Sequence, residues 1–325
     1  MGIINRYIKS TFRIGSYFIL ALIILILGLI AINYRADIPA SKLETKYFTK
    51  ESSYVQIGDA NLHIRKRGMG PALFLIHGSF ASLHTWENWE KELNNQFTTI
   101  SIDLPGHGLT GPNQHEDYST DYYADLIFAL ADTLQIDTFF VAGNSLGGMV
   151  AWKMTLKKPE RIKKLILIDA AGYEKFGTIS NTGNRPLIFR MLEIKPLALL
   201  LTKVTPRFLF KMNLKEVYGD PGKFTDTELD RYYELMRREG NREATMKRLQ
   251  HYGRNLQDSI QYIQTPTLIL WGEKDRWIPV ENAHKFHTDI AHSKLIIFPD
   301  AGHIPMEEFP KISADSVSIF LIDRQ

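Results

Sequence analysis

The sequence has 325 residues, of which 44% are hydrophobic and 23% are charged, with no cysteine and a formal net charge of +3. This composition is typical of a globular chain with a large core, and it excludes disulfides, thiolate metal sites and cysteine nucleophiles. The mild positive charge, without a nucleic-acid-binding motif, argues against a nucleic-acid partner. Any nucleophile must therefore be an oxygen or a nitrogen.

An uncharged apolar run covers residues 14–32, behind a short basic head at residues 1–13. As a helix rising 1.5 Å per residue, this run spans roughly the 30 Å hydrocarbon core of a bilayer. A buried core helix is disfavoured because apolar residues cover every face. A cleaved secretory signal is the other alternative, but it has a shorter apolar core and a clearer cleavage site. The run predicts a single transmembrane anchor.

Basic residues flank the predicted anchor on both sides, so the positive-inside count nearly ties. A short basic head favours the cytoplasmic side, whereas long domains cross the membrane largely regardless of charge. We therefore expect a single-pass protein of the cell membrane whose C-terminal domain lies on the non-cytoplasmic side. Residues 33–53 are expected to form a polar, charged tether.

Strands and helices alternate after the tether. Residues 54–58 and 61–68 read as a hairpin, and an alternating β and α pattern then runs to about residue 172 and resumes at about residue 259. Short apolar strands separated by helices predict an α/β fold with a mostly parallel twisted sheet and helices on both faces. The core is expected to comprise residues 54–172 and 259–325.

Residues 173–258 interrupt this pattern with helical, basic and apolar pieces. An insertion of this length at the C-terminal strand ends predicts a helical cap or lid, the alternative being a partner-binding module. Part of it has an interfacial composition that favours membrane contact. The alternative is an ordinary lid with solvated charges. The basic residues concerned, set against the lone Glu193, are Arg185, Arg190, Lys195, Lys203, Arg207, Lys211 and Lys215.

Ser145 lies in the sequence GNSLG, which matches the pattern G-x-S-x-G at an expected strand-to-helix junction. Glycines on either side permit the sharp turn that would raise the serine above the sheet. The helix that begins at Leu146 directs unpaired amide groups toward negative charge forming beside the serine. Ser145 is therefore the candidate nucleophile.

A serine hydroxyl needs a base and a group that orients that base. His303, in the loop after the last apolar strand, is the best-placed histidine, whereas His77 and His107 read as turn or core residues. Asp275 leads the acid candidates because it follows the preceding strand, in the chain order Ser, Asp, His. Glu273 and Asp169 remain alternatives, and Asp103 is expected to hold a loop.

Five motifs, in this chain order, resemble the α/β-hydrolase superfamily from about Tyr54 to the end of the chain: LIHG, DLPGHG, GNSLGG, WGEKDRWIP and GHIPMEEFP. The segments HGSFASLHTW, AGNSLGG and LILIDAAG also resemble a group of membrane-anchored bacterial lipases and esterases. The resemblance implies Ser145 as nucleophile, Asp275 as acid and His303 as base. It further implies an oxyanion hole made by the backbone amides of Ser79 and Leu146, with Phe80 as the alternative to Ser79.

These residues predict a serine hydrolase that cleaves carboxylic esters through an acyl-enzyme, with no metal or cofactor. The expected partners are a small hydrophobic ester or lipid and the membrane, and the sequence leaves the oligomeric state open. Hydrolases that cleave carbon–carbon bonds in aromatic degradation are the enzymatic alternative, since they share a similar elbow. A non-catalytic binding protein on the same fold is the alternative from another class.

Overall fold

The computed structural model describes residues 2–173, 188, 191, 194–250 and 257–323. Within them, eight strands form one sheet in the order β1-β2-β4-β3-β5-β6-β7-β8. The pairs β1/β2 and β2/β4 are antiparallel and all other neighbours are parallel, which confirms the predicted mostly parallel sheet. The strands are β1 (Ser52–Ile57), β2 (Ala60–Arg67), β3 (Ala72–Ile76), β4 (Thr98–Ile102), β5 (Phe139–Asn144), β6 (Ile162–Ile168), β7 (Thr267–Gly272) and β8 (Ser293–Phe298).

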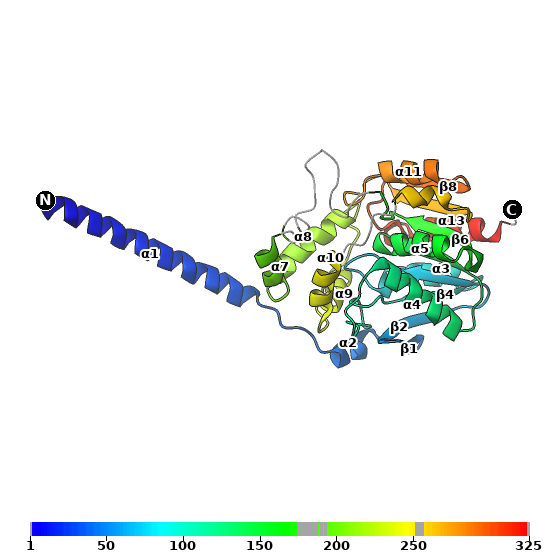
Figure 1. Cartoon of the computed structure of the whole chain (residues 1–325), viewed down its shortest axis with the longest axis horizontal. Coiled ribbons are helices and arrows are strands. Elements are labelled where there is room, and N and C mark those ends of the chain that lie inside the picture. Colours follow the sequence, from blue (N-terminus) through cyan, green and yellow to red (C-terminus); the bar gives the residue numbers. More distant parts are fainter. Residues whose placement is uncertain (1, 174–187, 189–190, 192–193, 251–256, 324–325) are drawn as a thin grey trace.

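Helices cover both faces of the sheet (Figure 1). One face packs against α4, α5 and α11, and the other against α3 and α13. The central strands β3, β5 and β7 are buried along their whole length, as expected for parallel strands between two helical layers. The helices of the core are η1 (Leu83–Trp86), α3 (Glu87–Leu93), α4 (Thr120–Thr133), α5 (Leu146–Lys157), η2 (Pro159–Arg161), α11 (Glu281–Asp289), α12 (Pro305–Glu308) and α13 (Pro310–Ile322).

Residues 173–258, which we call the insert, lie between β6 and β7. The elements in their described part are helices. Leu214, Val217 and Leu229 pack in the same apolar cluster as residues of β7 and α13, so the insert lies on the core. Arg185, Arg190 and Glu193 lie outside the described residues. The helices here are α7 (Lys195–Leu201), α8 (Arg207–Val217), α9 (Asp226–Met236), α10 (Asn241–Gln250) and, leading into β7, η3 (Gln257–Tyr262).

The N-terminal helix α1 (Gly2–Asn33) projects away from the rest of the molecule (Figure 1). Its stretch Gly15–Asn33 is long and apolar enough to cross a membrane, and none of that stretch is buried. A core helix would bury most of such a stretch. The structure therefore contradicts the core-helix alternative.

The expected tether contains ordered structure. Helix α2 (Ala40–Tyr47) lies within it, and Leu43 and Tyr47, one helical turn apart, are buried with Leu109 and Leu235. The surface that buries them comes from a core loop and from the insert, both distant in sequence. A polar composition of this kind gives no local sign of such docking.

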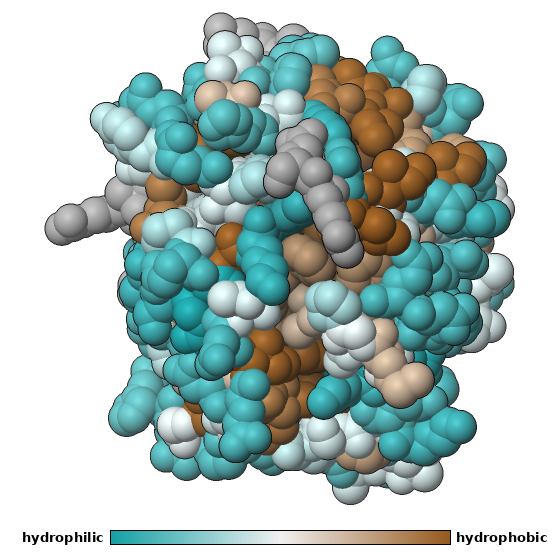
Figure 2. All heavy atoms as spheres, turned by 90° about the vertical axis from the view of Figure 1, so that its right-hand side faces the viewer, coloured by the Kyte–Doolittle hydropathy of each residue, from teal (hydrophilic) through white to brown (hydrophobic). Residues whose placement is uncertain are grey.

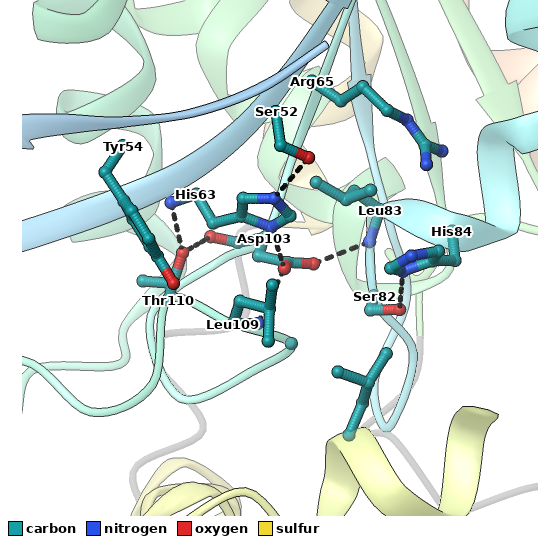
Figure 3. Close-up of polar contacts among 12 residues, drawn as sticks. Ser52, Tyr54, His63, Arg65, Ser82, Leu83, His84, Asp103, Leu109 and Thr110 are labelled. Atoms are coloured by element: carbon teal, nitrogen blue, oxygen red, sulfur yellow. Dashed lines mark hydrogen bonds and ion pairs between the residues drawn. The ribbon is translucent and has the colours of Figure 1, made fainter. Parts of the chain in front are cut away.

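A buried polar cluster around Asp103 fixes two loops of the core (Figure 3). One carboxylate oxygen accepts from Leu83 N at 2.7 Å, and the other accepts from Leu109 N at 2.8 Å and from His63 Nδ1 at 2.7 Å. Burial raises the pKa of Asp103, but the hydrogen bond and charge of His63 outweigh it, so the pKa lies well below the usual value. Asp103 thus holds a loop, as its sequence suggested.

We expect Asp103→Asn to lower the free energy of unfolding by about 3–5 kcal/mol, because an amide nitrogen would face donors that need an acceptor. Asp103 is ionised in the folded chain below its unfolded pKa, so its contribution is present above about pH 4 and is lost as pH falls further. Urea unfolding at several pH values measures both effects.

The matched control is Asp125→Asn, which removes an exposed ion pair with Lys157 and should cost less than about 1 kcal/mol. Equal losses for the two variants would show that the Asp103 cluster does not stabilise the fold.

Candidate active site

Ser145 occupies a strained turn between β5 and α5, with φ 54° and ψ −115°. A side chain other than glycine at positive φ costs on the order of 1–3 kcal/mol and occurs most often at functional sites. The flanking glycines are required by space: a Cβ at Gly143 would lie 2.1 Å from Gly147 O, and one at Gly147 would lie 2.0 Å from Ile76 O. The turn therefore exists only because the chain has no side chains at these two positions.

His303 lies in the loop between β8 and α12, where its Nδ1 is 2.7 Å from Asp275 Oδ2. The other carboxylate oxygen of Asp275 accepts from the backbone N–H of Trp277 at 2.7 Å and of Ile278 at 3.0 Å. Nδ1 therefore donates, which leaves His303 Nε2 as an acceptor. Within the described part of the chain, His303 Nε2 and Ser145 Oγ are both buried without a hydrogen-bond partner.

The structure separates the three acid candidates. Asp275 is hydrogen-bonded to His303, whereas Glu273 is exposed. Asp169 ends up close by: oxygens of both aspartates and a ring nitrogen of His303 all lie within 4.8 Å of one another. Asp169 has φ 43° and accepts from Gly272 N at 2.9 Å. Burial, and then the charge of Asp275, raise the pKa of Asp169 well above its usual value.

Within the described residues, this trio is also the group of side chains close enough to hold a metal ion. Its imidazole nitrogen and the nearest carboxylate oxygen already bond each other, however, at 2.7 Å. A raised pKa disfavours the ionised form of Asp169, which is the form that a hard cation prefers. The arrangement fits a hydrogen-bonded acid–imidazole pair better than a metal centre.

Two residues that the sequence did not single out hold the His303 loop in place. Asn144, next to the serine, donates from Nδ2 to His303 O at 2.9 Å and to Ile168 O at 3.2 Å. Glu308 accepts from Gly302 N at 2.6 Å and from Gly219 N at 3.0 Å, which ties the loop to the insert. Most of their partners are distant in sequence. The signal in the sequence that could have indicated these roles was the position of the two residues within the motifs GNSLGG and GHIPMEEFP.

The loop after β3 faces Ser145. A Cβ at Gly78 would lie 3.1 Å from Ser145 Cβ, and the neighbouring Phe80 has φ 61°. His77 lies behind this loop, where its Nδ1 donates to Gly78 O at 2.7 Å and its Nε2 accepts from Leu104 N at 3.1 Å. Burial lowers the pKa of His77, as it does that of His107, so both rings are neutral supports.

A pocket opens between the core and the insert. His303, Asn144 and the 78–81 loop form its core end, and α7, α8 and α10 form much of the remaining wall. The wall is mostly apolar, which suits a hydrophobic ligand that reaches the serine with its polar end. The apolar side chains of the insert that line it are Ile188, Leu201, Leu209, Phe210, Leu214, Val217, Met236 and Met246.

A second Ser–His–Asp array occurs in the Asp103 cluster, where Ser52 Oγ is 3.0 Å from His63 Nε2 (Figure 3). Its geometry does not fit a nucleophile. Ser52 Oγ accepts from Thr49 N at 3.1 Å. Both carboxylate oxygens of Asp103 accept from loop amides, and one of them also accepts from His63. His303 of the Ser145 site lines the pocket, whereas Ser52, His63 and Asp103 are not among the described residues that line it. The array is a structural support, and the Ser145 site is the candidate active site.

Known proteins resemble this chain over most of its length. An uncharacterized hydrolase, YugF of Bacillus subtilis, is 24% identical over 250 residues, covering 77% of this chain and 89% of the relative. A 2-hydroxy-6-oxononadienedioate/2-hydroxy-6-oxononatrienedioate hydrolase of Escherichia coli is 28% identical over 255 residues, covering 74% and 84%. The crystal structure of a membrane phospholipase A, described as a bacterial virulence factor, is 25% identical with a TM-score of 0.71, covering 94% and 98%.

The family model for the alpha/beta hydrolase fold matches residues 71–310, which include β3 to the start of α13 and every candidate site residue. The strand order and the position of Ser145 at the β5–α5 turn agree with that match. The chain therefore belongs to the alpha/beta hydrolase fold family and is a hydrolase of that fold.

Proposed function

We propose that this hydrolase cleaves carboxylic esters with an apolar acyl group, through an acyl-enzyme formed on Ser145. The observation that carries the proposal is that Ser145 Oγ and His303 Nε2 are both buried without a hydrogen-bond partner in the described part of the chain, and that His303 lines an apolar pocket. Buried polar atoms normally have partners. A nucleophile and its base are an exception that catalysis explains, since each bonds to the substrate or to the other during reaction.

In the proposed reaction, Ser145 Oγ attacks the ester carbonyl carbon while its proton passes to His303 Nε2. Asp275 holds the Nδ1–H of His303 and stabilises the imidazolium that forms. The tetrahedral intermediate breaks the carbon–oxygen bond, and the leaving alcohol takes the proton from His303. Water then attacks the acyl group by the same route, which releases the acid and restores Ser145.

The oxyanion of the intermediate is proposed to bind the backbone N–H groups of Leu146 and Ser79. Leu146 is the first residue of α5, where a helix leaves its amide without an internal partner and the helix dipole favours negative charge. Ser79 lines the pocket beside Gly78, in the loop that Asp103 anchors through Leu83 N. The backbone N–H of Phe80, a residue that itself has positive φ, remains the alternative donor.

The pocket favours a neutral apolar substrate over a dicarboxylate. The Escherichia coli relative is named for dianionic substrates whose carbon–carbon bond it hydrolyses. In this chain, Arg242 is the permanently charged side chain among the described pocket residues. Its guanidinium is occupied by Asp37 Oδ1 at 2.6 Å, by Arg35 O at 2.7 Å and by Thr205 Oγ1 at 3.0 Å. Among the described pocket residues, a substrate carboxylate would therefore find no available cation.

We also propose that α1 anchors the enzyme in the cell membrane as a single transmembrane helix, with the catalytic domain on the non-cytoplasmic side. The support is the length and full exposure of its apolar stretch. The insert then acts as a lid over the pocket, and the membrane phospholipase A that resembles this chain is consistent with a lipid ester as substrate.

A fluorophosphonate probe should label the detergent-solubilised full chain once, at Ser145. Ser145→Ala should lose the label and about 10⁶ in kcat, because the nucleophile is removed. Ser52→Ala, the serine of the second array, should keep both. Mass spectrometry of the labelled peptide and ester hydrolysis rates provide the readouts; labelling at Ser52 would reverse the assignment.

A graded series of p-nitrophenyl esters should show kcat/KM rising with acyl length, by roughly fourfold per buried methylene, until the pocket is filled. A 2-hydroxy-6-oxo dienoate of the kind cleaved by carbon–carbon hydrolases should be turned over far more slowly. A higher kcat/KM for the dienoate than for every ester would establish the alternative activity.

Asp275→Asn should lower kcat by about 10⁴, since the amide favours the wrong tautomer of His303. Asp169→Asn should change kcat by less than about tenfold, because the amide oxygen can still accept from Gly272 N and the carboxylate that bonds His303 is that of Asp275. Steady-state rates with one ester decide the ranking. The opposite order would make Asp169 the orienting acid.

A further inference from the structure

Helices α7 and α8 carry apolar side chains on two faces. One face lines the pocket with Leu201, Leu209 and Phe210. A second set of apolar side chains, which we call the outer face, points to solvent: Ile194, Leu199, Leu200, Phe208 and Met212, which are 57%, 66%, 38%, 64% and 52% exposed. A helix that covers a pocket needs one apolar face, and contiguous exposed apolar residues mark a contact surface.

The outer face lies beside the C-terminal end of α1. Tyr34, the residue after α1, forms a bridge with Val204 in the α7–α8 connection, and Arg35 N donates to Lys203 O at 2.9 Å. Figure 1 shows α7 and α8 at the side of the domain from which α1 projects. The helix that crosses the membrane in the proposed function thus ends against the two helices that expose this apolar surface.

Further contacts hold the insert to the chain that follows α1. Asp37 Oδ1 accepts from Arg242 Nη2 at 2.6 Å, and Ile38 N donates to Arg237 O at 2.8 Å. Helix α2 continues the contact, since Lys46 Nζ lies 2.8 Å from Glu234 Oε2. The segment 34–47 is therefore packed along the insert and cannot act as a long flexible spacer between it and the bilayer.

Three basic residues in or between α7 and α8 form ion pairs with acids of the chain, which reduces the basic surface that the sequence suggests. Lys203 pairs with Glu243 at 3.0 Å and with Asp37 at 3.4 Å, and Arg207 pairs with Asp230 at 2.6 Å. Lys211 lies 3.2 Å from Asp226. Lys195 and Lys215 are exposed, so these ion pairs offset only part of the positive charge, and the feature that we argue from is the apolar one.

Exposure alone does not select this surface. Helix α13 exposes Ile312, Ile319 and Ile322 by 60%, 72% and 58%. Figure 2 shows apolar patches among hydrophilic residues on the face of the molecule that looks away from α1. What distinguishes the outer face of α7 and α8 is its continuity with the end of an apolar helix that needs a bilayer.

We infer that the outer face of α7 and α8 lies in the surface of the bilayer that α1 crosses, so the partner of this surface is lipid. The inference rests on the proposed membrane anchoring. The lid then has lipid on one side and the pocket on the other. Leu201, Thr202, Thr205 and Pro206 line the pocket, and the intervening Lys203 and Val204 pair with the segment after α1. An ester lying in the bilayer would therefore meet the pocket wall without crossing water.

The absence of native cysteine allows a direct test. Phe208→Cys and Leu199→Cys, labelled with an environment-sensitive fluorophore, are reconstituted as full chains in neutral phosphatidylcholine vesicles. Both labels should emit at shorter wavelength than in detergent-free buffer, be quenched by lipids brominated on the acyl chain, and resist aqueous iodide, at low and high salt alike. Ile319→Cys, equally exposed but at the far end from α1, should show the reverse quenching pattern.

Iodide quenching of Phe208 and Leu199 labels equal to that of Ile319 would overturn the inference, whether or not the enzyme is active. Failure of the chain to float with the vesicles would overturn both the anchor and the outer face. Quenching that requires anionic lipid and disappears in salt would replace the apolar contact by an electrostatic one. Repeating the measurement in Ser145→Ala separates the contact from catalysis.

Function provides a second readout. The triple variant Leu199→Ser, Phe208→Ser, Met212→Ser should lower hydrolysis of a lipid ester held in vesicles by at least about tenfold, since loss of even one large buried apolar side chain corresponds to roughly that factor. Hydrolysis of a short soluble ester should be unchanged, because these side chains do not line the described pocket. The control variant Ile312→Ser, Ile319→Ser, Ile322→Ser should affect neither. Equal lipid rates for both triple variants would contradict a role of the outer face.

Discussion

The close approach of α5 to the sheet determines the rest of the site. Gly147 lies so near β3 that a Cβ there would meet Ile76 O at 2.0 Å, and Gly148 similarly lies against Ala170, with a Cβ separation of 2.5 Å. This packing brings the start of α5 down onto the strand ends and forces Ser145 to positive φ. The strain is held because Ser145 N donates to Ile168 O and Ala171 N donates to Ser145 O.

The strands that end near Ser145 supply its neighbours for the same reason. β5, β6, β7 and β8 are parallel, so their carboxyl ends and the loops that follow meet at one edge of the sheet. Asp169, Asp275 and His303 follow three of these strands. Asp275 bonds the imidazole, and burial together with the charge of Asp275 raises the pKa of Asp169 well above its usual value.

The insert contacts the pocket, the His303 loop and the segment that follows α1. It forms the pocket wall, it is tied to the His303 loop through Glu308 and through His303 N donating to Val217 O at 2.7 Å, and it packs along residues 34–47. A displacement of the insert would therefore be felt at the imidazole. The segment after α1, the insert and the His303 loop are therefore linked by direct contacts.

The sequence by itself determined the features that depend on local pattern. Alternating apolar strands and helices predict the α/β class, and the glycines around Ser145 predict the turn, since only glycine fits there. An uncharged run of 19 residues predicts a helix of membrane length. Chain order was enough to favour Asp275 over Asp169 as the partner of His303, which is the pairing that the structure shows.

Only the tertiary structure decided what depends on groups far apart in the chain. Nothing local marks residues 40–47 as a helix docked on the insert, because the surface that buries Leu43 and Tyr47 comes from residues 109 and 235. Composition likewise does not predict that Lys203 pairs with Glu243 and Asp37, or that Arg207 pairs with Asp230. Charge counts along a sequence predict a basic surface, whereas distances in space decide whether those charges remain available to a partner.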